Sequence, residues 1–285
     1  VEQLRVEGVR GRGSTALLGG RGAPLPHLHT LHLVGRQQQQ PPPPPPPPPQ
    51  AEAQEEEEEE ADADADAESE GLQLPWEHLP CLTHLTLAQL AGVLHSLRGV
   101  HAPLLASLVA SDNALHAVEA LDTPLLSHLD LSRNRISSLQ HLSHLDLLRT
   151  LHVEDNLVQD LSPLRGLRSL QVLRAARNQV QRLQGCVEGL DMLLTLDLQG
   201  NCIAFCEEIF ALHSCKLLHT LSLQGNPCCE VQGYRELVVA ALPQLGVLDD
   251  VRITAEEKIK AQIVVASLRG GMEEQEEEGV KVPGR

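Results

Sequence analysis

The glycine-rich residues 8–15, Gly-Val-Arg-Gly-Arg-Gly-Ser-Thr, are spaced almost as in a phosphate-binding loop. That motif requires a lysine where this chain has Ser14, and it continues into a helix, whereas no helix-forming run follows here. The lysine supplies the positive charge that holds the β- and γ-phosphates of a nucleotide. We therefore expect no nucleotide site in this segment and no cofactor for the chain.

Five of the seven cysteines fall between residues 202 and 229, which raises the question of a zinc site. Their spacings do not form the paired C-x-x-C halves of a structural zinc site. Cys206 and Cys228 stand at or near apolar positions, where a free thiol packs as a small hydrophobic group. An odd number of cysteines also fits a reducing compartment better than a secreted disulfide framework. We predict no bound metal. The five cysteines are Cys202, Cys206, Cys215, Cys228 and Cys229.

Fourteen histidines raise the question of acid–base or nucleophilic catalysis. Asp130 and His152 occupy matching places 22 residues apart and are predicted to form an ion pair on neighbouring strands. A catalytic triad also needs an activated hydroxyl or thiol beside the histidine. Ser132 is the nearest hydroxyl, and nothing in the sequence marks it as activated. We therefore predict that the chain is not an enzyme.

These polar residues must be positioned by a repeat that occupies most of the chain. Six stretches follow the pattern L-x-x-L-x-L-x-x-N, and their closing asparagines are 21, 22, 22, 23 and 25 residues apart. Self-similarity at a short period indicates stacked structural repeats. The widening toward the last two asparagines predicts that the array loosens before its end. The closing asparagines are Asn113, Asn134, Asn156, Asn178, Asn201 and Asn226.

Each part of the pattern has a physical reason. In L-x-L, strand alternation points both leucines to one side and the residue between them to the other. The turn after each strand leaves backbone donors and acceptors inside the stack, where a buried polar group needs a partner. Asparagine offers two donors and a carbonyl acceptor on a short stem. We therefore expect the asparagines to form a structural ladder that links one repeat to the next, rather than a functional site.

The pattern resembles the leucine-rich repeat family, in its short 22-residue subclass. The resemblance covers roughly residues 82–260 and implies an α/β solenoid, a horseshoe with a parallel sheet on its concave face. The alternative is a helical protein with Leu-x-x-Leu stripes. The L-x-L alternation and the recurring asparagine, which is a poor helix former, argue against that alternative.

We predict one domain with five consecutive segments. Two of these segments are low in complexity: a poly-Gln, poly-Pro and acidic insertion, and an acidic C-terminal tail. Like charges repel and offer little apolar surface, so we expect both to be disordered. The segments are residues 1–36, degenerate N-terminal repeats; 37–71, the insertion; 72–226, the repeats; 227–270, a C-terminal cap and helix; and 271–285, the tail.

The net charge of −17 is concentrated in the insertion and the tail. Of the 39 acidic residues, twelve lie within 52–70 and five within 273–278, which leaves 22 against 22 lysines and arginines. The repeats are therefore close to neutral. The nine consecutive prolines could bind a proline-recognition module, but no basic residue flanks them, and a tolerated repeat expansion is the simpler interpretation.

After Asn226 the sequence resembles the C-terminal cap of intracellular leucine-rich repeat proteins. Such a cap covers the leucines that the last repeat would leave open to water. We predict a helix that ends at Pro243, a strand at Leu245 to Leu248, and a second helix opened by the capping box of residues 254–257. The first helix is expected to bury Tyr234, Leu237, Val238, Ala241 and Leu242, and the second to align Ile259, Ile263 and Leu268.

Solenoids bind partners through the outward residues of their concave strands. In this chain those positions and the adjoining turns mix acids with bases, which suits a charge-complementary protein. They lack the basic stripe that nucleic acid requires. Only one Trp, one Tyr and two Phe occur, so the usual aromatic anchors of an interface are scarce. The candidate partner-binding residues are Asp130, Arg133, His152, Glu154, Asp155, Arg174, Arg177 and Asp197.

The sequence thus predicts a monomeric intracellular scaffold for protein–protein interaction, in the cytoplasm and with a cytoskeletal or ciliary role. The ciliary preference rests on residues 254–261, which resemble the cap extension of axonemal members of the family. Two alternatives stay open: a regulatory subunit of a type-1 protein phosphatase, and an acidic nuclear chaperone of histones. No apolar run approaches the roughly 18 residues needed to span a membrane.

Overall fold

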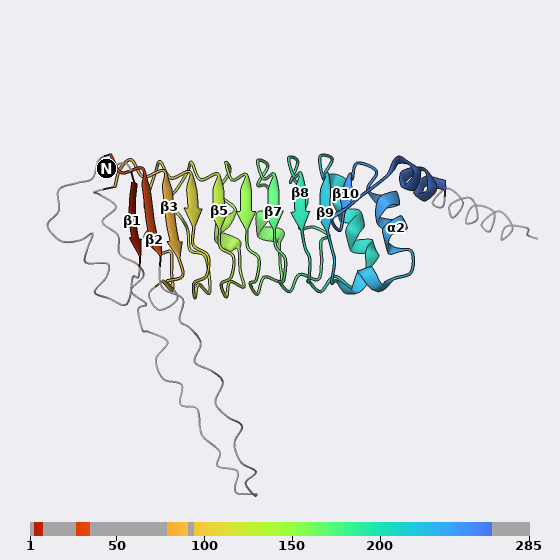
Figure 1. Cartoon of the computed structure of the whole chain (residues 1–285), viewed down its shortest axis with the longest axis horizontal. Helices are drawn as coiled ribbons and strands as arrows, with labels where there is room; N and C mark the ends of the chain where they lie inside the picture. Colours follow the sequence, from red (N-terminus) through yellow and green to blue (C-terminus); the bar gives the residue numbers. More distant parts are fainter. Residues whose placement is uncertain (1–2, 8–26, 35–78, 91–93, 264–285) are drawn as a thin grey trace, which may run out of the picture.

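The computed structural model describes residues 3–7, 27–34, 79–90 and 94–263. Within these residues eleven strands form one sheet in chain order, and the first ten run parallel (Figure 1). This arrangement confirms the solenoid. The strands are β1 Gln3–Glu7, β2 Thr30–Val34, β3 His84–Ala88, β4 Ser107–Val109, β5 His128–Asp130, β6 Thr150–His152, β7 Val172–Arg174, β8 Thr195–Asp197, β9 Thr220–Ser222, β10 Val247–Leu248 and β11 Val251–Arg252.

At the N-terminal end, β2 pairs in parallel with both β1 and β3. The pairing with β3 places Leu31 beside Leu85 and Leu33 beside Leu87, so the early copy continues the register of the later ones. Several sequence predictions lie outside the described residues: the glycine-rich residues 8–15, the insertion at 37–71, and the tail at 271–285.

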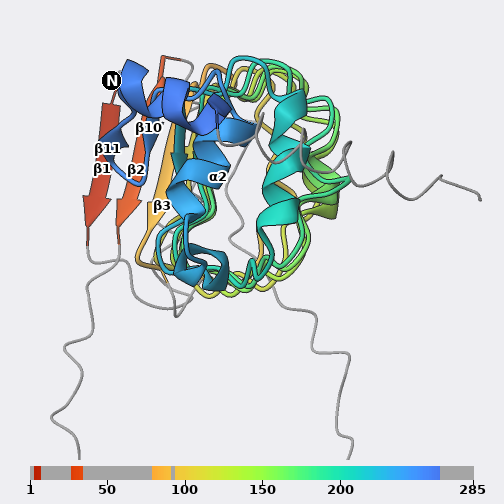
Figure 2. The same ribbon diagram turned by 90° about the vertical axis from the view of Figure 1, so that its right-hand side faces the viewer.

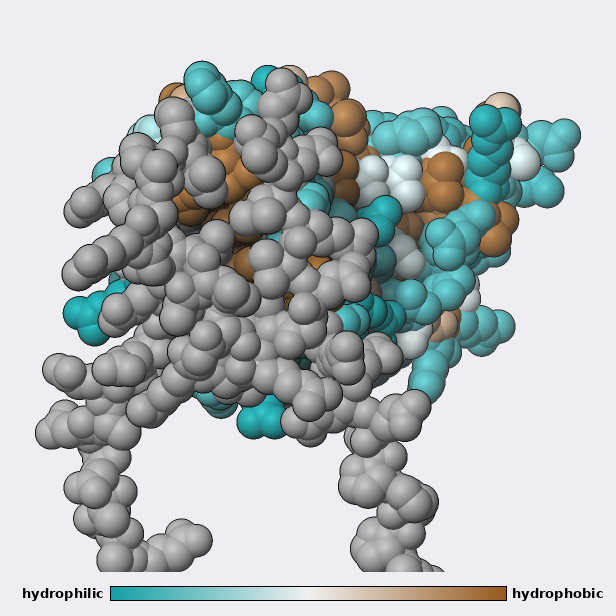
Figure 3. Space-filling model, turned by 60° about the vertical axis from the view of Figure 1, so that its left-hand side comes forward, coloured by the Kyte–Doolittle hydropathy of each residue, from teal (hydrophilic) through white to brown (hydrophobic). Residues whose placement is uncertain are grey.

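The core is a stack of strand leucines, as the L-x-L alternation predicts. Leu129, Leu151 and Leu173 are partners across three neighbouring strands, and each is fully buried. Each such leucine contributes roughly 1.5–3 kcal/mol relative to an exposed one. Figure 2 looks along the array and shows the strands on one side of the cross-section, with the return segments closing the other side. In Figure 3, the coloured part of the surface carries hydrophilic side chains with hydrophobic ones among them.

The return segments contain short 3₁₀ helices, which the sequence did not reveal. The longest, η4 Cys206–Ser214, occupies the widest gap between asparagines. It buries Ile209 and Leu212 almost completely. The prediction that the array loosens there is therefore wrong, because the extra residues form an ordered helix packed on the core. The other 3₁₀ helices among the described residues are η2 Gln140–Leu142, η3 Ser162–Leu164 and η5 Pro227–Glu230.

The cap begins with α2 Tyr234–Ala241, which ends before Pro243 as predicted. It buries Val238 and Val239, whereas Leu237 is 37% exposed. The predicted apolar face was therefore wrong at Leu237. The reason is that α2 packs against both η4 and η5, so two neighbours rather than one determine which of its residues are buried.

A hairpin completes the sheet, since β11 runs antiparallel to β10. Its two turn residues, Asp249 and Asp250, have φ angles of 51° and 62°, as the two-residue turns favoured in hairpins require. Asp249 Oδ1 accepts a hydrogen bond from the backbone N–H of Leu223 at 2.7 Å, and Tyr234 donates its hydroxyl to Asp249 Oδ2 at 3.0 Å. Asp249 thereby ties the hairpin to the last repeat.

The second cap helix covers residues 255–263 as far as the structure describes it. Its capping box is present, because Glu257 accepts from the backbone and hydroxyl of Thr254, and Thr254 accepts from the backbone N–H of Glu257. The buried residue of this helix is Ala261, whereas Ile259 is 58% exposed. The side of this helix that carries Ile259 and Ile263 is therefore exposed. Leu268 lies outside the described residues.

Candidate partner-binding surface

Each ladder asparagine follows the last residue of its strand, from β4 to β9, by four positions, and all six are 2–8% exposed. Asn156 shows the common geometry: its Oδ1 accepts from Ile136 N at 3.0 Å, and its Nδ2 donates to the carbonyls of Leu131 and Val153 at 3.0 and 3.1 Å. One side chain thus joins the backbone of its own turn to that of the preceding repeat. The ladder holds every turn in one conformation and so positions the residues beside it.

The residue before each ladder asparagine is left-handed. Asp112, Arg133, Asp155 and Arg177 have φ angles between 53° and 56°, a conformation that costs a non-glycine residue roughly 1–2 kcal/mol. The constrained turn brings these side chains together in pairs. Arg133 Nε lies 2.6 Å from Asp112 Oδ1, and Arg177 Nε lies 2.5 Å from Asp155 Oδ1. We call Asp112, Arg133, Asp155 and Arg177 the turn row. Each acid of the turn row is paired with an arginine of the same row, so their charges balance.

The strand row lies next to the turn row and comprises the residues between the two leucines of each strand. Sheet register places Asp130 beside His152, His152 beside Arg174, and Arg174 beside Asp197. Neighbouring parallel strands are about 4.8 Å apart. Four candidate residues from distant parts of the sequence are thus brought into one line across the concave face.

The two aspartates of the strand row bind their own turns. Asp130 Oδ1 accepts from Ser132 N at 2.9 Å and from Ser132 Oγ at 2.6 Å, and Asp197 Oδ1 accepts from Gln199 N at 3.1 Å. The predicted ion pair between Asp130 and His152 is wrong: the two are neighbours in register, but no ring nitrogen of His152 lies within 4.0 Å of a carboxylate oxygen of Asp130. Asp130 binds Ser132 instead, because a hydrogen-bond donor two residues away in the same turn loses less conformational freedom on pairing than a side chain on another strand does.

His152 is half-buried at the middle of the strand row. Burial lowers its pKa below the ordinary value of 6.5, and the positive charge of Arg174 acts in the same direction, while Asp130 opposes both. The ring of His128 approaches edge-on, with 5.5 Å between ring centroids. His152 is therefore a neutral hydrogen-bonding group at pH 7.

Among the described residues, no ion pair and no side-chain hydrogen bond is formed by Glu154 or Arg174, unlike the other charged candidates of this surface. Burial raises the pKa of Glu154, and Arg174 counteracts that rise. Arg174 is exposed, and no carboxylate of the described residues lies within 4.0 Å of its guanidinium. Because the other candidate charges bind their own turns or one another, His152, Glu154 and Arg174 keep the most capacity to bind a second molecule.

Sequence reasoning missed Asp112, the ion-pair partner of Arg133. A signal was present, since Asp112 precedes Asn113 just as Arg133 precedes Asn134. The pairing could have been inferred from the alternation of acid and base at that one position in four successive repeats.

The hydroxyl, thiol and metal-ligand candidates from the sequence can also be located in the described residues. Ser132 Oγ donates to Asp130 rather than to a histidine. All seven cysteines are free thiols, and burial together with neighbouring Cys229 raises the pKa of Cys228 to about 12. Among the described residues no group of three or more potential ligands is placed to hold a metal ion. The helices in this part of the chain are too short or too polar to cross a bilayer.

Comparison with known proteins supports the repeat architecture. U2 small nuclear ribonucleoprotein A′ of Mycosarcoma maydis is 35% identical over 109 residues, which are 38% of this chain and 44% of that protein. Dynein axonemal assembly factor 11 of Xenopus laevis is 48% identical over 60 residues, 21% of this chain and 13% of that protein. The similarity thus spans less than half of either relative.

A solved structure shows the same fold. Internalin C2 of Listeria monocytogenes matches with a TM-score of 0.50 and 28% identity, over 60% of this chain and 72% of that one. The leucine-rich repeat family model matches residues 116–276, more than half of the chain. This chain belongs to the leucine-rich repeat family.

Proposed function

We propose that the chain is a non-enzymatic scaffold that binds a partner protein on its concave face. The binding surface is the concave patch, which we define as His152, Glu154 and Arg174. The partner presents an acidic side chain to Arg174 and a hydrogen-bonding group to neutral His152.

This proposal rests on the exposure of Arg174 and on its lack of an ion-pair partner among the described residues. Its guanidinium is exposed and lacks a carboxylate within 4.0 Å among the described residues, although acids are common on the same face. Arginine forms strong paired hydrogen bonds with carboxylates. The turn row cannot supply that carboxylate, because Asp155 already binds Arg177 through two hydrogen bonds. Glu154 acts on Arg174 from beyond ion-pair distance, so an external acidic group is the natural partner.

The concave patch also accounts for affinity without aromatic anchors on this face. Truncating one member of a buried, hydrogen-bonded charge pair at an interface costs about 2–5 kcal/mol. A single well-formed pair to Arg174, desolvated by the partner, therefore matters more than many rim contacts. Reversing the charge of Arg174 adds repulsion to that loss.

For the cellular setting we propose a ciliary cytoskeletal assembly in the cytoplasm. The support is the similarity to an axonemal dynein assembly factor over 60 residues. The similarity to a small nuclear ribonucleoprotein subunit favours a second candidate, a nuclear ribonucleoprotein assembly in which the chain again contacts protein. Regulation of a type-1 phosphatase and histone binding stay as alternatives.

One affinity purification separates these settings. The tagged full chain is expressed in ciliated cells, and co-purifying proteins are identified by mass spectrometry. The Arg174→Glu variant is compared with Arg168→Glu, which reverses an exposed arginine of the same repeat away from the strand row. We expect axonemal or dynein-associated proteins with the wild type and with Arg168→Glu, and their loss with Arg174→Glu.

Several results would change this view. Partners that persist equally with Arg174→Glu would refute the concave patch. Spliceosomal proteins lost with the same variant would move the chain to the nuclear setting. Recovery of a type-1 phosphatase catalytic subunit, lost on combining Asp130→Ala with Arg174→Ala, would identify a phosphatase regulator. Histones that still bind after deletion of the acidic runs 52–70 and 273–278 would show that those runs are not the basis of a chaperone activity.

A further inference from the structure

The chain has two phenylalanines, and both lie on the surface of the repeat between Asn201 and Asn226. Phe205 is 68% exposed and Phe210 is 56% exposed, while the core is built from smaller aliphatic side chains. A phenylalanine carries a large apolar surface that folding normally buries. Neighbouring exposed apolar groups of this size mark interaction sites more often than isolated ones do.

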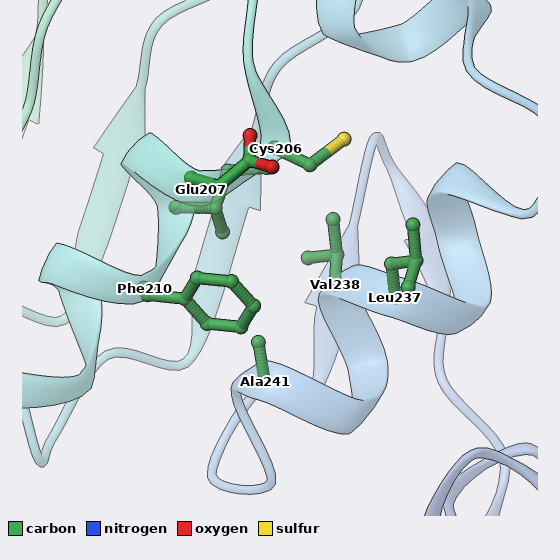
Figure 4. Close-up of a pocket in the computed structure, with 7 residues that line it drawn as sticks. Cys206, Glu207, Phe210, Leu237, Val238 and Ala241 are labelled. Atoms are coloured by element: carbon green, nitrogen blue, oxygen red, sulfur yellow. The ribbon is translucent and has the colours of Figure 1, made fainter. Parts of the chain in front are cut away.

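Phe210 borders a groove between η4 and α2. Figure 4 shows its ring reaching from η4 toward Val238 and Ala241 of α2, with Leu237 on the same helix. The groove has a volume of about 110 Å³ and an almost wholly apolar lining, apart from Glu207. That volume is below the roughly 150 Å³ of a cavity that takes up benzene, so it suits one aliphatic side chain inserted from outside.

The groove lies apart from the concave patch. The end view shows η4, drawn in teal, on the side of the cross-section opposite the strands (Figure 2). A molecule in this groove would leave the strand row open. The two surfaces can therefore be tested independently.

Among the described residues, Glu207 is the one glutamate that lines the groove. The helices η4 and α2, and η5, which packs against α2, carry more acidic than basic side chains. Exposed glutamates occur on each of them: Glu207 on η4, Glu230 on η5 and Glu236 on α2. The only arginine or lysine of these three helices is Arg235, which is already paired with Glu257 at 2.8 Å. No basic side chain of the described residues pairs with the three glutamates. An occupant with positive charge beside its apolar face would complement this rim.

We propose that the groove is a second docking site, for a basic amphipathic helix of a partner protein. The helix inserts one large aliphatic side chain beside Phe210 and Leu237, as in helix-in-groove recognition. Its lysines or arginines face Glu207 at the groove and are attracted by the acidic surface of the adjoining helices. Phe205, exposed directly before η4, lies outside the lining of the groove and tests how far the contact extends.

The test uses a labelled peptide of roughly 18 residues with leucines on one helical face and lysines on the other. Binding to the full chain is measured by fluorescence anisotropy at about 0.15 M salt, which screens weak attraction to the acidic runs. Phe210→Ala and Phe205→Ala are compared with Leu147→Ala. Leu147 is 48% exposed in a distant repeat and serves as the matched apolar control. Thermal melts establish that each variant is folded.

We expect Phe210→Ala to weaken binding by at least about tenfold, as hot-spot truncations do, and Phe205→Ala to weaken it less. Leu147→Ala and Arg174→Glu should leave the affinity unchanged. A peptide with glutamates in place of the lysines should not bind. These variants retain every acidic residue, so a loss at Phe210 cannot come from non-specific attraction.

Equal binding by wild type and Phe210→Ala would overturn the proposal, as would equal binding of the acidic peptide. Light scattering on the full chain supplies a further check. If the wild type is a dimer that Phe210→Ala converts to a monomer, a second copy of the chain covers the groove and the partner-helix proposal fails.

Discussion

Replacing Asn156 by leucine tests whether the asparagine ladder stabilises the fold. Asn156 is 5% exposed, and its side chain joins Ile136 N to the carbonyls of Leu131 and Val153. Leucine has a similar shape and suits an apolar interior, but it can neither accept nor donate a hydrogen bond. The change therefore removes the polar contacts with little change in volume.

The size of the effect depends on which backbone groups keep another partner. The carbonyl of Leu131 also accepts from Asn134 Nδ2 at 2.8 Å, and that of Val153 accepts from Asn178 Nδ2 at 2.8 Å. The N–H of Ile136 has no second acceptor in the described residues. A buried donor left without a partner costs about 1–3 kcal/mol. With the weakened carbonyl contacts added and the apolar gain of leucine subtracted, we expect a net loss of about 2 kcal/mol.

For an array of this size that loss lowers Tm by about 4–8 °C. Thermal unfolding followed by circular dichroism measures it. Gln159→Leu is the matched control, because Gln159 is an exposed amide of the same repeat. Its loss should change stability by less than about 0.5 kcal/mol. If Asn156→Leu shifts Tm no more than Gln159→Leu does, the ladder is not what holds the repeats together.

Two further predictions concern pH. Burial lowers the pKa of His152 below 6.5, so the folded chain binds this proton less readily than the unfolded chain. Stability should therefore fall as the pH drops below about 6.5. We expect an NMR titration midpoint for His152 below 6.5 and a smaller loss of Tm between pH 7 and 5 in His152→Gln; a midpoint at or above 6.5 would contradict the burial argument. The pKa of Glu257 is lowered to about 2 by its hydrogen bonds to Arg235 and Thr254. Its contribution is present above about pH 4.5 and is lost as the pH falls toward 2, so the helix at 255–263 should fray over that range while Glu257→Gln shows no such dependence. Backbone chemical shifts of that helix measure the effect, and a helix that persists unchanged at pH 2 in the wild type would exclude this role for Glu257.

The strand architecture follows from the sequence because its period is local and redundant. Leu129 and Leu151 hold equivalent places in successive repeats. Because these two leucines are partners in the sheet, the residues beside them on the two strands are partners as well. This is why Asp130, His152 and Arg174 could be placed in one row without coordinates. The left-handed residues Asp112, Arg133, Asp155 and Arg177 could also have been located, since each directly precedes a ladder asparagine.

The repeat period predicts which residues are neighbours in a row. It does not predict which of several nearby groups a side chain will bind. Asp130 lies beside His152, yet its carboxylate binds the backbone and hydroxyl of Ser132. The cap shows the same limit at a larger scale. Val239 is buried and Leu237 is partly exposed because α2 has neighbours on two sides, and the packing of those neighbours is not encoded in the α2 sequence alone.

The ladder also restricts where this chain can evolve contacts with other molecules. Its asparagines and strand leucines are committed to the interior, and the arginines of the turn row, Arg133 and Arg177, are held by Asp112 and Asp155. Substitutions that preserve the fold are then possible in the strand row, and insertions that preserve it are possible in the return segments. The gap between Asn201 and Asn226 is the widest between ladder asparagines, and it places Phe210 on the surface. A polar contact through Arg174 and an apolar one through Phe210 thus arise from the two places that the repeat leaves free.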